Sequence, residues 1–148
     1  MQTDDPIQQK LFHVLHVDDD SSFLKVSKMI LELKNKFEID TATSVDEAFC
    51  KLKTQIYDAV VCEYCLPLKN GLDFLKELRN QKNNVAFIIL TSNGSEEVVI
   101  EAINLDADYY IDKSGSPEAV FCELANAIRE TVTRKKEERS TKGNSCVV

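Results

Sequence analysis

The chain has 148 residues, of which 43% are hydrophobic, and a formal net charge of -7 with a sequence pI near 4.9. This length is enough to bury one full hydrophobic core, so a single domain is expected. The acidic balance disfavours a sequence-independent grip on nucleic acid or on an anionic membrane, because both need a basic surface. Protein partners or metal cations fit the composition better.

Targeting signals and cysteine usage indicate a cytoplasmic protein. No apolar run approaches the roughly 20 residues of a membrane helix, and the polar segment 1–10, predicted to be an N-terminal extension, lacks the apolar stretch of a signal peptide. Five cysteines form an odd set without the density of a disulfide scaffold. Cys62 and Cys65 have the spacing of a redox pair, but Pro67 follows instead of a helix start, which disfavours that role.

Short apolar runs alternate with longer amphipathic ones along residues 11–133, a pattern typical of alternating strands and helices. The predicted strands are 12–17, 37–42, 59–62, 85–90 and 109–111. The predicted helices are 21–34, 45–55, 71–80, 96–105 and 117–133. Several strands are apolar nearly throughout, as parallel strands covered on both faces must be. This alternation predicts a doubly wound parallel α/β sheet with right-handed crossovers.

Local signals support these boundaries. Ser44 with Glu47 predicts a capping box for the second helix. Ser116 followed by Pro117 is a good cap and first residue for the fifth. After Val132 the sequence is polar, with mixed charges and no apolar period, so we expect a frayed helix end and a polar tail over 134–148.

Charged side chains follow three of the predicted strands. Asp18 and Asp19 come after the first strand, Glu63 ends the third and Lys113 follows the fifth. In a doubly wound sheet such strand ends form the ligand edge, and clustered carboxylates suit Mg²⁺ or Mn²⁺. For the acidic run alone, a solvated turn in which one of Asp18, Asp19 and Asp20 caps the next helix is an equally good interpretation.

Histidine offers a weaker case for a metal site. His13 and His16 lie three residues apart on one strand, so they are expected to point to opposite faces of the sheet. Packing roles fit them better.

At this point the chain resembles the receiver domains of two-component response regulators, from Leu11 to about Val132. Four segments carry the resemblance: Val14-Leu15-His16-Val17-Asp18-Asp19-Asp20; Tyr57 to Pro67 followed by Asn70-Gly71; Leu90-Thr91-Ser92; and Tyr110-Ile111-Asp112-Lys113. The resemblance implies a CheY-like, flavodoxin-like (βα)5 fold with strand order 2-1-3-4-5. It also implies a Mg²⁺ or Mn²⁺ site made by Asp18, Asp19, Glu63 and the backbone carbonyl of Cys65.

The same resemblance assigns roles to three further residues. It implies that Thr91 supplies the hydroxyl that contacts the phosphoryl group, that Lys113 binds phosphate and that Tyr110 is the switch aromatic. An ordinary half-buried strand aromatic is nearly as good an interpretation of Tyr110. The resemblance to receiver domains also implies that the protein is not an enzyme, apart from at most self-phosphorylation and dephosphorylation. It implies a histidine kinase or another signalling protein as the partner. Docking would use the fourth helix, fifth strand and fifth helix, at 96–113 and 117–132.

Two positions depart from the family pattern. Glu63 stands where the acceptor aspartate is expected, and Ser114 replaces a proline that usually follows a cis bond. A cis bond without proline costs about 2.5–4 kcal/mol, so the Lys113–Ser114 bond is expected to be trans. The extra methylene of Glu63 would carry its carboxylate outward toward Lys113 and the Thr91 hydroxyl, in partial imitation of the phosphorylated state.

The sequence therefore favours a stand-alone receiver-like signalling module that is phosphorylation-independent or nearly so and acts by docking a partner protein. The main alternative is a phosphorylation-competent response regulator that accepts a phosphoryl group from a histidine kinase with Mg²⁺. A nucleotide- or flavin-binding protein of the same fold class is disfavoured, because Asp18, Asp19 and Asp20 would repel a phosphate. A phosphatase of the haloacid dehalogenase type lacks support from further motifs.

Overall fold

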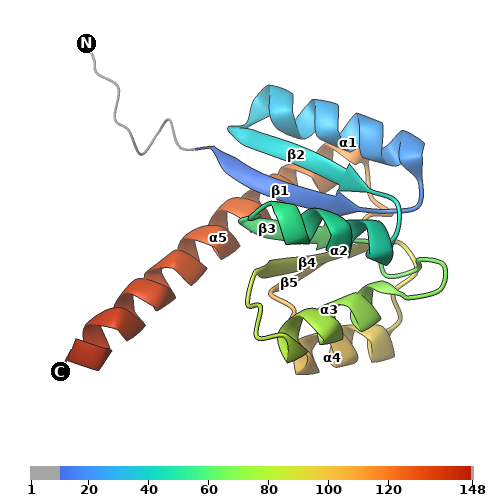
Figure 1. The fold of residues 1–148 in the computed structure, drawn as a ribbon. Helices are drawn as coiled ribbons and strands as arrows, with labels where there is room; N and C mark the ends of the chain where they lie inside the picture. The colour runs from blue at the N-terminus through green and yellow to red at the C-terminus, as the bar shows by residue number, and fades with distance from the viewer. Residues whose placement is uncertain (1–10, 148) are drawn as a thin grey trace, which may run out of the picture.

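The computed structural model describes the backbone of residues 11–147 and the side chains of residues 11–140, so the predicted extension at 1–10 lies outside the described residues. Strands and helices alternate throughout this part of the chain (Figure 1). The strands are β1 (Phe12–Val17), β2 (Phe37–Ala42), β3 (Ala59–Cys62), β4 (Ala86–Thr91) and β5 (Tyr109–Asp112). The helices are α1 (Ser21–Lys34), α2 (Val45–Thr54), α3 (Gly71–Asn80), α4 (Glu96–Asn104) and α5 (Pro117–Val147).

The five strands form one parallel sheet in the order β2-β1-β3-β4-β5. This confirms the predicted doubly wound architecture. Across the sheet Val17 pairs with Cys62, and Cys62 pairs with Ile89. The register therefore brings the carboxyl ends of β1, β3 and β4 to one edge, the edge at which this fold class binds ligands.

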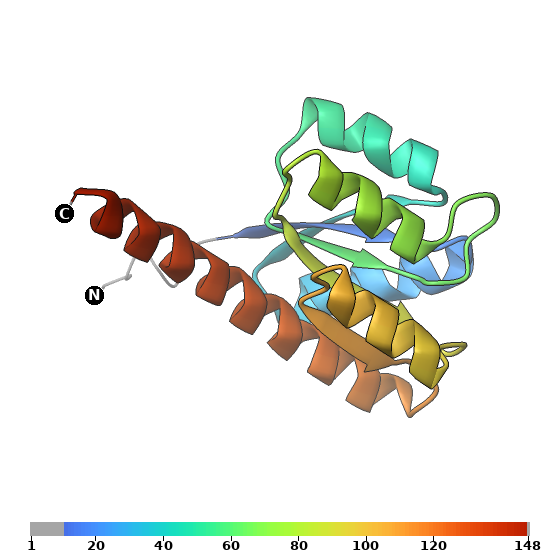
Figure 2. The same cartoon turned by 90° about the horizontal axis from the view of Figure 1, so that it is seen from below.

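Helices cover both faces of the sheet, as the apolar strands require. α1 and α5 pack on one face, and α2, α3 and α4 on the other (Figure 2). All residues of β3 and β4 are buried. His13 and His16 belong to opposite faces, as predicted. The His13 ring centroid lies 4.4 Å from that of Tyr57, in the cluster of α2, α3 and α4, with the two rings tilted at 45°, whereas His16 contacts α1.

Helix caps explain most of the boundaries. Ser116 Oγ accepts a hydrogen bond from the Ala119 amide, and Asp20 caps α1 by accepting from the Phe23 amide. The predicted capping box of α2 is only half formed. Ser44 accepts from the Glu47 amide, but the Glu47 carboxylate accepts from the Thr43 amide and hydroxyl instead of the Ser44 amide.

The full capping box lies at α3, where the sequence analysis did not place one. Asn70 Oδ1 accepts from the Asp73 amide at 2.8 Å, and Asp73 Oδ2 accepts from the Asn70 amide at 2.9 Å. Aspartate thus replaces the usual glutamate of this motif.

Helix α5 continues beyond the predicted end at residue 133 and projects past the sheet (Figure 2). Its extension begins with tertiary contacts: Arg134 and Lys135 both pair with Asp108 at 3.2 Å, and Lys135 donates to the Asn84 carbonyl at 2.7 Å. These ion pairs replace the missing apolar stripe, which is why hydrophobic periodicity ended the helix too early. Despite this length, no helix in the described part of the chain is apolar enough to span a bilayer.

Candidate functional site at the carboxyl edge of the sheet

Three of the predicted site residues meet at the carboxyl edge of the sheet. Asp18 follows β1, Glu63 follows β3 and Lys113 follows β5. The Glu63 amide donates to the Val17 carbonyl at 2.9 Å, which extends the pairing of β1 with β3 up to the site. Lys113 comes from the far edge strand, and its long side chain spans the end of β4 to reach both carboxylates.

The Lys113 ammonium bridges the two acidic side chains. Its Nζ lies 2.7 Å from Glu63 Oε1 and 2.9 Å from Asp18 Oδ2. The two remaining carboxylate oxygens accept backbone hydrogen bonds: Glu63 Oε2 from the Cys65 amide and Asp18 Oδ1 from the Asp20 amide, both at 2.9 Å. Each of the four oxygens therefore has a protein donor.

This cluster is largely withdrawn from water. The exposed fraction of the side chain is 2% for Asp18, 6% for Glu63 and 16% for Lys113. Burial raises the pKa of the Asp18 carboxyl, and the attraction of Lys113 only partly offsets it. Burial acts to lower the pKa of Lys113, but its hydrogen bonds to Glu63 and Asp18 outweigh that effect, so the net shift is upward.

The arrangement does not fit a divalent cation. Among the residues whose placement is described, no group of three or more His, Cys, Asp or Glu side chains is positioned to hold a metal ion. Asp19 is exposed, unlike Asp18 and Glu63. The three-carboxylate set expected from the sequence is thus not formed, and the Lys113 ammonium contacts both carboxylates that do meet and offsets one of their two negative charges.

Thr91 and Tyr110 lie on neighbouring strands beside this cluster. Thr91 is buried at the end of β4, and its Oγ1 accepts a hydrogen bond from the Asn93 amide at 3.1 Å. Tyr110 is half-buried, and burial together with the nearby Asp112 and Glu63 charges raises the pKa of its hydroxyl. The two predicted switch residues therefore lie near the carboxylate cluster.

Gly94 is a site residue that the sequence analysis missed. A Cβ at this position would lie 1.2 Å from the Tyr110 hydroxyl oxygen and 3.3 Å from Thr91 Cγ2. The tip of the tyrosine therefore occupies the space that any other residue would fill. A glycine three positions after Thr91 was the only sequence signal for this contact.

His16 and Phe23 form the wall behind Lys113. The Lys113 Nζ lies 4.5 Å from the centroid of the Phe23 ring, which the His16 ring meets edge-on at 5.8 Å. His16 is fully buried, its Nδ1 is 2.9 Å from the Ser27 hydroxyl, and burial with the nearby Lys113 charge lowers its pKa to about 3. The packing role predicted for this histidine agrees with these contacts.

The peptide bond after Lys113 has the predicted isomer. No peptide bond is cis among residues 11–147, so the Lys113–Ser114 bond is trans, as predicted. The Ser114 amide donates to Asp112 Oδ1 at 2.9 Å, and this turn leads to the start of α5 at Pro117. The ammonium still reaches the carboxylates without the family's proline.

Comparison with solved structures supports the fold. A CheY-like receiver domain protein from Methanospirillum hungatei JF-1 gives a TM-score of 0.77 at 26% identity, covering 87% of this chain and 99% of that one. A receiver domain protein from Clostridium thermocellum gives a TM-score of 0.74 at 31% identity, covering 85% of this chain and 98% of the other. The Francisella response regulator 1452 receiver domain gives 0.75 at 29% identity, covering 84% of this chain and 98% of that chain.

Sequence comparison leads to the same family. Response regulator SaeR of Staphylococcus aureus (strain USA300) is 34% identical over 125 residues, which are 84% of this chain and 52% of SaeR. The chain thus spans about half the length of the curated relatives it matches. The family model of the response regulator receiver domain matches residues 14–125. The chain therefore belongs to the response regulator receiver family and is a receiver domain of the two-component type.

Proposed function

We propose that this receiver domain signals without phosphorylation, or nearly so, by docking a partner protein. In this proposal Glu63 occupies the position of the phosphoacceptor aspartate. The observation that carries it is the 2.7 Å contact between Glu63 Oε1 and the Lys113 ammonium, with Glu63 Oε2 held by the Cys65 amide. Both oxygens of the would-be nucleophile are engaged.

Two physical arguments oppose efficient phosphoryl transfer to Glu63. In-line transfer tolerates little misplacement, and an offset near 1 Å can cost on the order of 10²-fold in rate. The extra methylene displaces the carboxylate outward relative to an aspartate. In addition, the nucleophile would have to leave its ion pair with Lys113 in a site where Glu63 is only 6% exposed.

The contact with Lys113 imitates part of the phosphorylated state. A phosphoryl group brings a charge of about -1.5 to -2 and three acceptor oxygens, whereas glutamate adds no charge over aspartate. The Thr91 hydroxyl accepts from the Asn93 amide, and the two Glu63 oxygens contact Lys113 and the Cys65 amide. We therefore propose that Glu63 keeps Lys113 in a permanent ion pair. Thr91 and Tyr110 remain the proposed switch residues.

We further propose that the site has little affinity for Mg²⁺ or Mn²⁺. A cation at Asp18 and Glu63 would have to displace the Lys113 ammonium from both side chains. Stabilisation by a bound ligand grows with its concentration relative to Kd. We expect millimolar Mg²⁺ to leave the melting temperature unchanged, and a clear rise would contradict this proposal.

The proposed docking face is α4-β5-α5, with a histidine kinase or another signalling protein as partner. Ile100 and Ile103 on α4 are 53% and 64% exposed. Beside them a hollow of about 290 Å³ is lined by Val99, Ala102, Ile103, Ala107, Asp108, Tyr109 and Tyr110. Exposed apolar groups next to the proposed switch tyrosine are suited to a protein contact.

Unpaired thiols at Cys50, Cys62, Cys65 and Cys122 support a reducing compartment such as the cytoplasm.

Intact-mass analysis after incubation with acetyl phosphate and Mg²⁺ tests the proposal. The protein and its Glu63→Asp variant are treated side by side, and Glu63→Ala serves as the control for other acceptor residues. A gain of one phosphoryl mass by Glu63→Asp alone is expected. A gain by the unmodified protein that disappears in Glu63→Ala would favour the phosphorylation-competent alternative. A gain by none of the three would contradict the view that Glu63 is what silences the site.

A further inference from the structure

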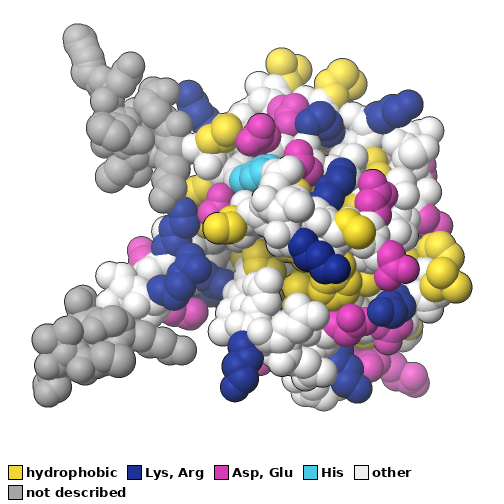
Figure 3. All heavy atoms as spheres, in the orientation of Figure 1, with side chains coloured by type: hydrophobic (Ala, Val, Ile, Leu, Met, Phe, Trp, Pro, Cys, Tyr) yellow, Lys and Arg dark blue, Asp and Glu magenta, His cyan; other side chains and the backbone are white. Residues whose placement is uncertain are grey.

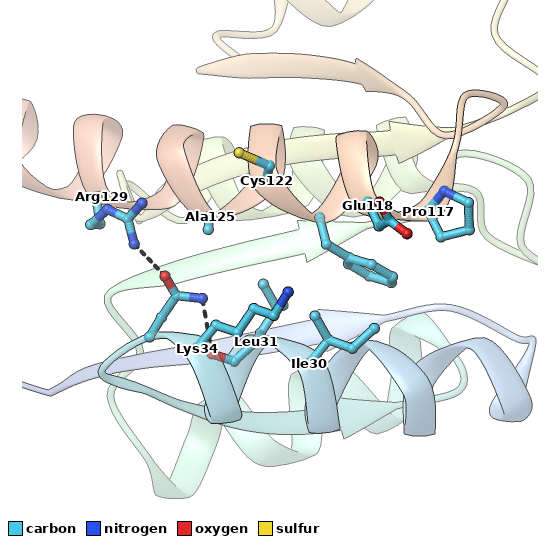
Figure 4. A pocket seen from close by; sticks show the side chains of 10 residues that line it. Ile30, Leu31, Lys34, Pro117, Glu118, Cys122, Ala125 and Arg129 are labelled. Atoms are coloured by element: carbon cyan, nitrogen blue, oxygen red, sulfur yellow. Dashed lines mark hydrogen bonds between the residues drawn. The ribbon is translucent and has the colours of Figure 1, made fainter.

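The face of the domain opposite the proposed docking helix α4 contains a cavity of about 250 Å³ between α1 and α5. Figure 4 shows the two helices running side by side with side chains from both of them lining the space. Its lining includes Ile30 and Leu31 from α1, and Pro117, Phe121 and Ala125 from α5. Leu31, Phe121 and Ala125 are buried core residues, so the floor of the cavity is apolar and fixed by the packing of the domain.

Basic side chains stand at the edge of this cavity. Lys34 is exposed, and its ammonium lies between the two helices in Figure 4. Arg129 lies at the end of the cavity away from Pro117, where its guanidinium donates to Asn35 Oδ1 and, at 2.7 Å, to Asn126 Oδ1. Glu118 lines the cavity near Pro117, at the start of α5, and carries the opposing charge.

We propose that this cavity binds a small amphipathic organic anion, with its apolar part on Leu31, Phe121 and Ala125 and its carboxylate at Lys34. Pockets that bind drug-sized ligands have volumes of roughly 300–1,000 Å³. This cavity is just below that range, so its volume suits a small ligand. The distribution of charge supplies the sign. Two cations, Lys34 and Arg129, and one carboxylate, Glu118, line the cavity, so the net charge of its lining is positive and favours an anionic head.

A second copy of the chain is the competing occupant. The outer side of α1 has exposed apolar residues at Val26, Met29 and Leu33, which are 42%, 61% and 79% exposed; hydrophobic side chains are visible over this helix in Figure 3. However, α1 is also basic, with four lysines in and just after it against one glutamate: Lys25, Lys28, Lys34, Lys36 and Glu32. A two-fold contact through this helix would bring like charges together, because such an interface uses the same patch twice.

The cavity is in physical contact with the carboxylate cluster. Phe121 in its floor stacks on Phe23 with the ring centroids 5.8 Å apart, and the Lys113 ammonium lies 4.5 Å from the centroid of the same Phe23 ring. A ligand that moves Phe121 would therefore shift the ring against which Lys113 lies. The binding proposal itself does not depend on the proposed function of Glu63.

Titration of the ¹⁵N-labelled 148-residue chain with octanoate, below its micelle concentration, tests this inference. We expect saturable amide shifts centred on Leu31 and Ala125. The amine of equal chain length, octylamine, should bind more weakly because its charge is reversed. Lys34→Ala should weaken octanoate binding by about 2- to 5-fold, the range for one solvent-accessible ion pair. Lys25→Ala, on the same helix but outside the cavity, is the matched control and should leave the affinity unchanged.

Two variants close the cavity. Ala125→Phe fills its floor, and Cys122→Trp places a large side chain on its exposed rim, so that one of them remains informative if the other fails to fold. Folding is checked by circular dichroism, and loss of octanoate binding in a folded variant is expected. Equal binding of octanoate and octylamine, binding that survives in a folded closed variant, or no saturable binding would overturn the proposal. Shifts of the same amides on diluting the protein alone would identify a second copy as the occupant and would also overturn it.

Discussion

Replacement of Lys113 by methionine removes the only cation that contacts both Asp18 and Glu63 among the described residues. Methionine keeps an unbranched side chain of similar reach, so the change acts mainly on charge. The two carboxylates are 2% and 6% exposed, and each would lose its ammonium partner while remaining buried. Removal of one member of a buried ion pair costs about 3–5 kcal/mol.

We therefore expect Lys113→Met to lower the unfolding free energy at pH 7 by about 3 kcal/mol, measured by urea denaturation monitored by circular dichroism. The melting temperature should fall by roughly 6–12 °C for a domain of this size. The low end of the energy range is appropriate because Lys113 is 16% exposed and water can partly replace it.

The pH dependence and a second substitution identify the cause of this loss. The penalty should shrink as the pH falls toward 4, because burial raises the pKa of the Asp18 carboxyl and its protonation removes the repulsion between Asp18 and Glu63. Glu63→Gln in the Lys113→Met background should recover about 1–2 kcal/mol for the same reason. Mg²⁺, which we expect to leave the parent protein unaffected, should stabilise Lys113→Met. A loss below about 1 kcal/mol, or one that is independent of pH, would refute the view that the ammonium neutralises this site.

Three further predictions concern the surroundings of the site. The His16 pKa is lowered from 6.5 to about 3, so the unfolded chain binds a proton that the folded state excludes. About 2.3 kcal/mol of stability should therefore be lost between pH 6.5 and 4.5, and pH-dependent unfolding of His16→Phe should lack this loss. Gly94→Ala should displace the Tyr110 ring, whose hydroxyl lies where the new Cβ would stand, and unchanged tyrosine ring resonances in the NMR spectrum would count against that geometry. Asp108→Ala should remove the carboxylate that pairs with Arg79, whose side chain is 12% exposed, at a cost of about 3 kcal/mol, and should speed amide hydrogen exchange in residues 134–140. Exchange protection equal to that of the parent protein would show that the ion pairs of Asp108 do not stabilise the extension of α5.

Local sequence patterns predicted the elements because the forces that define them act over short distances. The apolar runs at 59–62 and 85–90 favoured strands covered on both faces, and β3 and β4 are buried throughout. Caps at Asp20 and Ser116 bond to amides three residues onward, so the sequence contains both partners of each bond. The Asn70 and Asp73 box was overlooked only because its acid is aspartate instead of glutamate.

Interactions between distant parts of the chain required the folded structure. Where α5 continues past residue 133, its first contacts are ion pairs with Asp108, which lies 26 residues before Arg134 in the sequence. The role of Gly94 depends on where the Tyr110 ring lies, which is set by the packing of β5 on β4.

By itself, the sequence determined the order of strands and helices, the family, and the presence of Asp18, Glu63 and Lys113 at one edge of the sheet. Only the tertiary structure decided how these charges are paired. Asp18 and Lys113 are 95 residues apart, and the pairing depends on a lysine from an edge strand reaching across β4. Sequence patterns record which charges are present at the strand ends, whereas the direction of each side chain follows from packing around Phe23 and from backbone donors in the loops.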